Sequence, residues 1–230
     1  MPELAEVETV RRTLKKKILH KKIIKVDIYY PNMIESDINE FKNIVGSEFI
    51  DIHRKGKWLI FELNNYYLLS HLRMEGKYFI KDIEQPLEKH EHIVFTFIDN
   101  TDLRYHDTRK FGRMNLIKKE DINNIEALNK QGFEPNSKQL TKEYLYNKIS
   151  KKNLHIKTLL LDQTIISGLG NIYADEVLFA SKINPLKKGN EITLEECQKI
   201  IDASGKIIKK AIENGGTTIR SYTSSLGVYG

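Results

Sequence analysis

The sequence predicts an α+β fold, in which a leading helix is followed by a β-sandwich and then by a helical segment. Residues 4–18 carry Val7, Val10, Leu14 and Ile18 at three- and four-residue spacing, the period of an amphipathic helix. Short segments rich in β-branched and aromatic residues follow, at intervals typical of an antiparallel sandwich or barrel. From about residue 119 onward the apolar spacing becomes helical again.

Each later element is predicted from its composition and its turn residues. The predicted strands are residues 22–30, 47–54, 57–63, 66–72, 92–98, 102–106 and 112–117. Turn-forming asparagine and aspartate residues at 64–65 and 100–102 separate neighbouring strands. The predicted helices are residues 120–129, 141–150, 156–162, 171–182 and 193–214. A Gly-Phe-Glu-Pro-Asn segment at 132–136 predicts a boundary between an N-terminal domain, residues 1–132, and a C-terminal domain, residues 133–230.

Composition narrows the class of protein. The 230 residues are 40% hydrophobic, enough for a core, and contain no apolar run long enough to span a membrane. The charged N-terminus lacks a signal segment, so we expect an intracellular, cytoplasmic protein. The single cysteine, Cys197, excludes a disulfide framework and a cysteine zinc site. A net charge of +6 favours a polyanionic partner, although each lysine or arginine cluster alone is typical of a solvated face.

The N-terminal Met1-Pro2-Glu3 can carry chemistry. A methionine before a small residue is normally removed, which leaves Pro2 with a free secondary amine able to attack a sugar carbon. An α-amino group titrates near pH ~8, against ~10.4 for lysine, so more of it is neutral and nucleophilic. Glu3 places a carboxyl beside that amine for proton transfer. The alternative is that Glu3 only adds negative charge to the first turn of a helix.

Two other segments are candidates for binding. In residues 167–176, Gly168 and Gly170 precede a helix and permit close approach of another backbone. The amides at the start of that helix could bind a phosphate, or the side chain of Asn171 could cap them. In residues 105–113, Arg109 and Phe111 lie in a charged loop, and Met74 lies in another. Apolar wedges beside arginine fill a duplex where a base is unstacked, whereas isolated Met or Phe residues more often belong to a core.

These motifs together resemble the formamidopyrimidine-DNA glycosylase family. The matching segments occur in family order along the whole chain: Met1–Val10, Lys57, Lys89–His92, Asp107–Gly112, Gly168–Ala174 and Asn214–Arg220. Leu4 favours this family over the related endonuclease VIII group. Ala5 departs from the proline usual in the family, which makes the start of the chain less rigid and leaves the chemistry untouched.

The resemblance implies a DNA glycosylase and AP lyase of base-excision repair, with a helix-two-turns-helix C-terminal domain. Its substrates are oxidised purines, 8-oxoguanine and formamidopyrimidines, in damaged double-stranded DNA. Pro2 attacks C1′ and forms a Schiff base, Glu3 donates a proton to open the sugar, and Lys57 is the acid-base for β-elimination, which δ-elimination follows. A glycosylase cannot reach C1′ inside a stacked duplex, so the nucleotide must be extruded.

The resemblance also implies the DNA contacts. The DNA-binding residues are His71, His90, Arg109, Lys152 and Asn171. Met74, Arg109 and Phe111 fill the void left by the extruded base. The loop over the lesion contains Thr217, Thr218, Arg220 and Tyr222. We expect a monomer.

The family continues into a four-cysteine hairpin that binds one Zn²⁺ and carries a phosphate-binding arginine. These 230 residues hold one cysteine, so we expect no cofactor or metal in this chain and either a fragment or a truncated product. Two alternatives follow: an endonuclease VIII-like glycosylase for oxidised pyrimidines, or a non-catalytic DNA-binding remnant. An RNA-binding protein is disfavoured, since the sequence has no RNP-type or GXXG signature in a suitable context.

Overall fold

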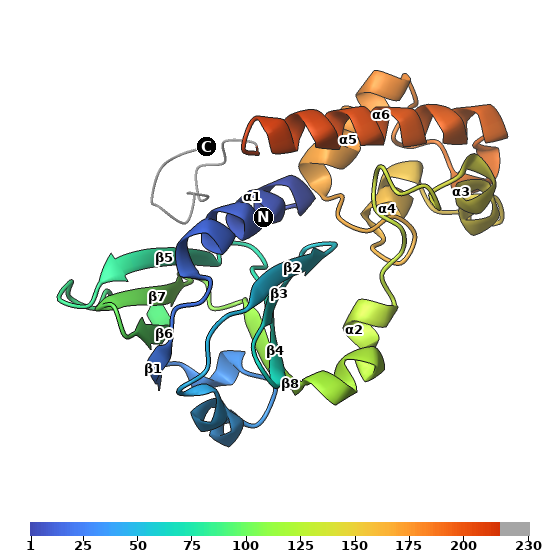
Figure 1. Ribbon diagram of the computed structural model, residues 1–230. Coiled ribbons are helices and arrows are strands. Elements are labelled where there is room, and N and C mark those ends of the chain that lie inside the picture. The colour runs from blue at the N-terminus through green and yellow to red at the C-terminus, as the bar shows by residue number, and fades with distance from the viewer. Residues whose placement is uncertain (217–230) are drawn as a thin grey trace.

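Two antiparallel four-stranded sheets form the N-terminal half of the computed structural model, which describes residues 1–216 (Figure 1). The first sheet has the order β1 (Ile23–Ile28), β6 (Glu91–Phe97), β7 (Thr101–His106), β5 (Lys77–Asp82). The second has the order β2 (Asp51–Lys55), β3 (Trp58–Glu62), β4 (Tyr66–His71), β8 (Arg113–Lys118). The predicted α+β class and sandwich are confirmed.

The sandwich core is aromatic at its centre. The Phe49 ring lies 5.4 Å from that of Phe61 and 5.8 Å from that of Phe95, so residues from both sheets meet in tilted and edge contacts. Helix α1 (Leu4–Ile18) adds its apolar stripe, including Val7 and Leu14, to the same core. The three- and four-residue spacing that predicts the helix therefore also defines its buried face.

The C-terminal half consists of helices α3 (Lys142–Ile149), α4 (Ile156–Leu161), α5 (Asn171–Ser181) and α6 (Leu194–Glu213). Their core also contains Leu4 and Ala5, the first turn of α1. Helix α1 thus packs its first turn on the helices and its later turns on the sheets, and it lies between the two halves (Figure 1). Within the described residues, no helix is both long and apolar enough to cross a membrane.

The structure differs from the predicted elements at three places. Strand β5 was not predicted, because only one of its residues, Tyr78, is buried and its apolar pattern is weak. Residues 47–50, predicted as strand, form only a single bridge at Glu48. The predicted helix 120–129 is a 3₁₀ helix, Lys119–Asn124, followed by the one-turn α2 (Glu126–Asn129). Ile122, Ile125 and Leu128 recur every three residues and pack near Trp58, a spacing that suits 3₁₀ geometry.

Arg54 on β2 joins the second sheet to α1 and to the segment between the two halves. Its guanidinium donates to Glu8 of α1 at 2.9 Å and to both carboxylate oxygens of Glu134 at 2.7 and 3.0 Å. Glu134 also accepts from the backbone amide of Gly56 at 2.6 Å. This bidentate pair fixes the β2–β3 turn relative to the helical half, because a planar guanidinium matches a carboxylate in one orientation.

The ionised Glu8 carboxylate makes the stability of the fold depend on pH in the acidic range. Burial raises its pKa, but hydrogen bonds from Arg11, Arg54 and Arg12 outweigh burial and lower the pKa from 4.5 to about 2. A depressed carboxyl pKa adds stability above pH ~4.5 that is lost as pH falls toward 2, on the order of 2 kcal/mol. Urea unfolding of the Glu8→Gln variant should therefore vary less between pH 5 and pH 2 than wild type. Equal pH dependence of the two proteins would contradict this.

Candidate active site

Glu3 connects the N-terminus of the chain to the start of α5. Its carboxylate is 2% exposed and accepts backbone amides from Gly170 at 2.6 Å, Ile172 at 2.9 Å and Tyr173 at 3.4 Å. Glu3 therefore caps a helix that begins 168 residues later (171 − 3). The expected cap by Asn171 is wrong: Gly170 occupies the N-cap position and Asn171 is the first helical residue, with no side-chain cap bond. The amides expected to bind a phosphate are occupied by Glu3.

The two glycines before α5 make this contact possible. A Cβ at Gly170 would lie 2.5 Å from Cδ of Glu3, and a Cβ at Gly168 would lie 2.3 Å from Cδ1 of Leu4. Gly168 also has φ +107°, a conformation that side chains disfavour, and its carbonyl accepts the Leu4 amide at 3.0 Å. The Gly-Leu-Gly segment is thus the surface on which Glu3 and Leu4 pack.

Glu6 is a site residue that the sequence reasoning missed. It is fully buried, accepts the Glu3 amide at 2.9 Å and accepts the Tyr173 hydroxyl at 2.7 Å. The Glu3-x-x-Glu6 spacing of a capping box was the available signal. Glu6 holds the backbone next to Pro2, which is itself buried.

Lys57 lies in the turn between β2 and β3 and faces these carboxylates. It is 5% exposed, and burial lowers the pKa of its amine from 10.5 to about 8, although the charges of Glu3 and Glu6 oppose that shift. For Glu3, burial raises the pKa and outweighs the hydrogen bonds to its carboxylate and the Lys57 charge. Both groups are therefore shifted toward the pH range where protons move readily.

His71, at the end of β4, lies beside Lys57. Its ring is 4.8 Å from that of Trp58, its partner in the β3–β4 register, and its Nδ1 accepts the Arg73 amide at 3.1 Å. Burial, followed by the charges of Arg73 and Lys57, lowers the pKa of His71 to about 3. The imidazole is therefore neutral at physiological pH, with Nδ1 as acceptor and Nε2 as donor.

Met74, Arg109 and Phe111 lie on two loops that a hydrogen bond joins. Met74 is 37% and Phe111 47% exposed, so neither is a core residue. The Arg109 guanidinium lies 4.7 Å from the centre of the Phe111 ring. The Thr108 hydroxyl donates to the carboxylate of Glu75, which links the Met74 loop to the Phe111 loop.

His90 precedes β6 and belongs to a group of three histidines. Its ring lies 5.7 Å from that of His106 and 6.3 Å from that of His92. His92 Nε2 contacts the backbone carbonyl of Asp107 at 2.7 Å, the residue that begins the Arg109 loop. His90 is therefore packed beside that loop.

Two further predicted DNA contacts, Lys152 and Asn171, lie on the surface of the helical half. Lys152 follows α3; its side chain is exposed, and its backbone carbonyl accepts the Asn190 amide at 3.0 Å. Asn171 is also exposed, next to the helix start that Glu3 caps. The predicted lesion loop, Thr217, Thr218, Arg220 and Tyr222, lies outside the described residues.

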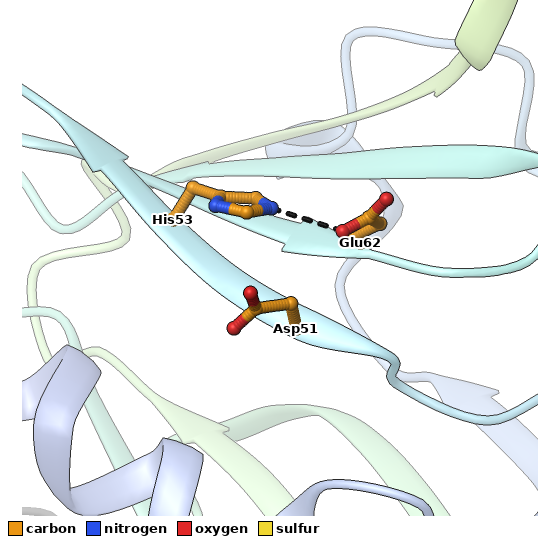
Figure 2. A group of neighbouring side chains, drawn as sticks. All are labelled: Asp51, His53 and Glu62. Carbon is orange, nitrogen blue, oxygen red and sulfur yellow. Dashed lines mark hydrogen bonds and ion pairs between the residues drawn. The ribbon is translucent and has the colours of Figure 1, made fainter.

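One cluster of metal-ligating residue types lies at the end of the β2–β3 hairpin opposite Lys57. Figure 2 shows Asp51, His53 and Glu62, whose ligand atoms lie within 4.8 Å of one another. His53 Nε2 contacts Glu62 at 3.0 Å, Lys15 pairs with Asp51 at 2.8 Å, and Lys119 pairs with Glu62 at 3.1 Å. Lysines already neutralise both carboxylates, so we interpret this as an ion-pair cluster.

The zinc site that the sequence resemblance implies does not fit these residues. It would need four cysteine ligands, and these 230 residues contain only Cys197, which is buried in α6. Burial raises the pKa of its thiol to about 11, which keeps the sulfur protonated and a poor ligand.

The sandwich and the helical half thus meet near a buried lysine and a buried carboxylate, and loops that expose Arg, Phe and Met side chains lie on the sandwich. Two family models match the chain: the formamidopyrimidine-DNA glycosylase N-terminal domain over residues 1–114 and the H2TH domain over residues 131–223. The chain belongs to the formamidopyrimidine-DNA glycosylase family.

Curated relatives carry the same family name. The formamidopyrimidine-DNA glycosylase of Lactobacillus helveticus is 45% identical over 232 residues, which cover 100% of this chain and 84% of that protein. The one from Bacillus anthracis is 44% identical over 233 residues, with the same coverage.

Solved structures of a relative contain damaged DNA. Lactococcus lactis Fpg bound to DNA containing N7-benzyl-Fapy-dG has a TM-score of 0.92 and 41% identity, over 98% of this chain and 84% of that one. The same protein bound to DNA with an oxidised pyrimidine has a TM-score of 0.91 and 40% identity, over 100% and 84%. This likeness confirms the fold as well as the family.

Proposed function

We propose that this protein excises oxidised purines from duplex DNA and cleaves the resulting abasic site, with Pro2 as its nucleophile. The observation that carries the proposal is the packing of the first residues. Glu3, which follows Pro2 in the chain, is hydrogen-bonded to backbone amides at the start of α5, and Lys57 faces its carboxylate. The family membership and the DNA-bound relatives support a DNA substrate.

Removal of Met1 gives Pro2 its free secondary amine. The amine's lone pair forms a bond to C1′, the glycosidic bond breaks as its electrons leave with the base, and the amine's N–H proton passes to the departing base. Glu3 donates a proton to the ring oxygen O4′ as the sugar opens, which leaves an iminium between Pro2 and C1′. The buried Glu3 is suited to this step because its pKa is raised by burial and it retains a proton at higher pH than an exposed carboxyl.

The second step breaks the DNA strand. A water molecule takes the C2′ proton from the iminium, the electrons move toward C3′, and the C3′–O bond breaks to release the phosphate. Negative charge develops on that leaving phosphate. The Lys57 amine, with a pKa of about 8, is mostly cationic at pH 7 and donates its proton more readily than an ordinary lysine.

The exposed loops serve DNA distortion. C1′ is unreachable in a stacked duplex, so the nucleotide must rotate out and something must fill its place. Met74 and Phe111 are exposed apolar side chains, and the Arg109 guanidinium lies against the Phe111 ring, which suits insertion into a base stack with a charged contact to the backbone. His71, His90, Lys152 and Asn171 supply the proposed phosphate contacts.

The test is excision from defined duplexes. The protein without Met1 should release 8-oxoguanine and formamidopyrimidine faster than thymine glycol and leave a cleaved strand. Faster release of thymine glycol would instead identify an enzyme for oxidised pyrimidines. Duplex affinity without base release or cleavage would identify a non-catalytic DNA-binding protein and contradict the proposal.

A further inference from the structure

Tyr105 on β7 lies beneath both loops that carry the exposed wedges. The side chain is fully buried, and its hydroxyl fills the space beside two glycines that end those loops. A Cβ at Gly76, after Met74, would lie 2.4 Å from this hydroxyl, and a Cβ at Gly112, after Phe111, would lie 1.7 Å from it. One hydroxyl group therefore supports the end of each loop.

The same hydroxyl is bonded to Asp107, which organises the Phe111 loop. Tyr105 donates to Oδ2 of Asp107 at 3.2 Å, and the Gly112 amide donates to that oxygen at 2.8 Å. The other oxygen, Oδ1, accepts the amides of Arg109 and Lys110, both at 3.0 Å. Burial, with the Asp107 charge, raises the pKa of Tyr105 well above 10, so the hydroxyl keeps its proton and remains a donor.

We propose that Tyr105 is a positioning residue that couples the Met74 loop to the Arg109–Phe111 loop, so that both wedges enter DNA as one unit. This inference rests on the proposed function, in which the two loops fill the void left by the extruded nucleotide. The Thr108–Glu75 hydrogen bond is a second link between the loops, at their exposed side. Tyr105 forms the buried link, where the low local dielectric strengthens its bond to Asp107.

Removing the hydroxyl should loosen both loops without touching the chemical groups. Asp107 loses one donor, and a gap opens between Gly76 and Gly112 that the loops can relax into. Loss of a hydrogen bond to a carboxylate corresponds to about a tenfold effect on the step that requires the ordered loops. Base-stack insertion should slow by that factor, while reaction at an abasic site in single-stranded DNA, which needs no insertion, should not.

The experiment compares Tyr105→Phe with Tyr78→Phe. Tyr78 is a suitable control because it is equally buried, its ring lies 5.2 Å from that of Tyr105, and its hydroxyl donates to Ser70 instead. Insertion is followed by stopped-flow fluorescence of 2-aminopurine placed next to a tetrahydrofuran abasic analogue in duplex DNA. Borohydride trapping on single-stranded abasic DNA is measured in parallel, and thermal unfolding checks the fold of each variant.

Tyr105→Phe should slow the 2-aminopurine signal about tenfold relative to wild type and Tyr78→Phe, with single-strand trapping unchanged. Gly112→Ala, which forces the hydroxyl aside, should also slow the signal. Equal signals in Tyr105→Phe and wild type, equal slowing by Tyr78→Phe, or no signal from wild type would each overturn the inference. The 2-aminopurine assay uses the tetrahydrofuran analogue, which does not react, so it reports insertion alone. If the wild-type protein forms no borohydride-trapped adduct, the proposed catalysis is refuted, but the insertion assay still decides this inference.

Discussion

Glu3→Gln should reduce base excision from 8-oxoguanine duplex by roughly 10²- to 10⁴-fold, the range for loss of a positioned proton donor. The amide is the same size but cannot donate the proton that opens the sugar. Excision is measured by single-turnover release of the damaged base at pH 7.

The same variant separates proton donation from helix capping. An amide has only one acceptor atom, so it cannot accept the amides of both Gly170 and Ile172 as the carboxylate does. Stability should fall by about 1 kcal/mol, as for loss of a cap. Glu8→Gln, on the same helix but paired with arginines, is the matched control and should excise at the wild-type rate at pH 7.

On DNA that already contains an abasic site, Glu3→Gln should still form an adduct with Pro2, because the open-chain aldehyde needs no ring opening. A variant that loses adduct formation on abasic DNA as severely as base release would show that Glu3 holds the N-terminus rather than donates a proton.

Lys57→Met should slow strand cleavage at an abasic site by about 100-fold at pH 7. Methionine preserves the length of the buried side chain and removes the proton. In wild type the cleavage rate should fall as pH rises through about 8, because the cationic donor is lost above its pKa.

The pH profile of Lys57→Met should lack that fall near pH 8. The substitution also leaves the buried carboxylates of Glu3 and Glu6 without their neighbouring cation, so thermal unfolding of the variant is measured in parallel to separate loss of stability from loss of the proton donor. A wild-type inflection that persists in Lys57→Met would assign the titration to another group.

Local periodicity explains how far the fold could be predicted. Helix α1 was predicted at its observed bounds, Leu4–Ile18, because its apolar stripe packs continuously against two cores. Strand β5 was missed because it is an edge strand with one buried residue, so its side chains need not alternate. Tertiary packing, rather than propensity, determines such a strand.

The sequence names candidate site residues, whose roles stay predictions, but it does not predict which contacts hold them in place. Pro2, Glu3 and Lys57 were named from motifs, and the structure brings them together between the halves. The cap of α5 could not be predicted, since Asn171 has the local sequence of a cap while the residue that caps the helix, Glu3, lies far away in sequence. The Arg54–Glu134 pair and the Tyr105–Asp107 bond are likewise long-range or buried contacts that leave no periodic signal.

The central claim is that the amine of Pro2 attacks the sugar. The most direct measurement is borohydride reduction of the reaction with lesion duplex, followed by proteolysis and mass spectrometry of the DNA-linked peptide. The account predicts a single adduct on the N-terminal peptide, at Pro2, that is absent when Met1 is retained and absent in Pro2→Gly. An adduct mapped to Lys57 or another lysine, or one that survives with Met1 in place, would contradict it.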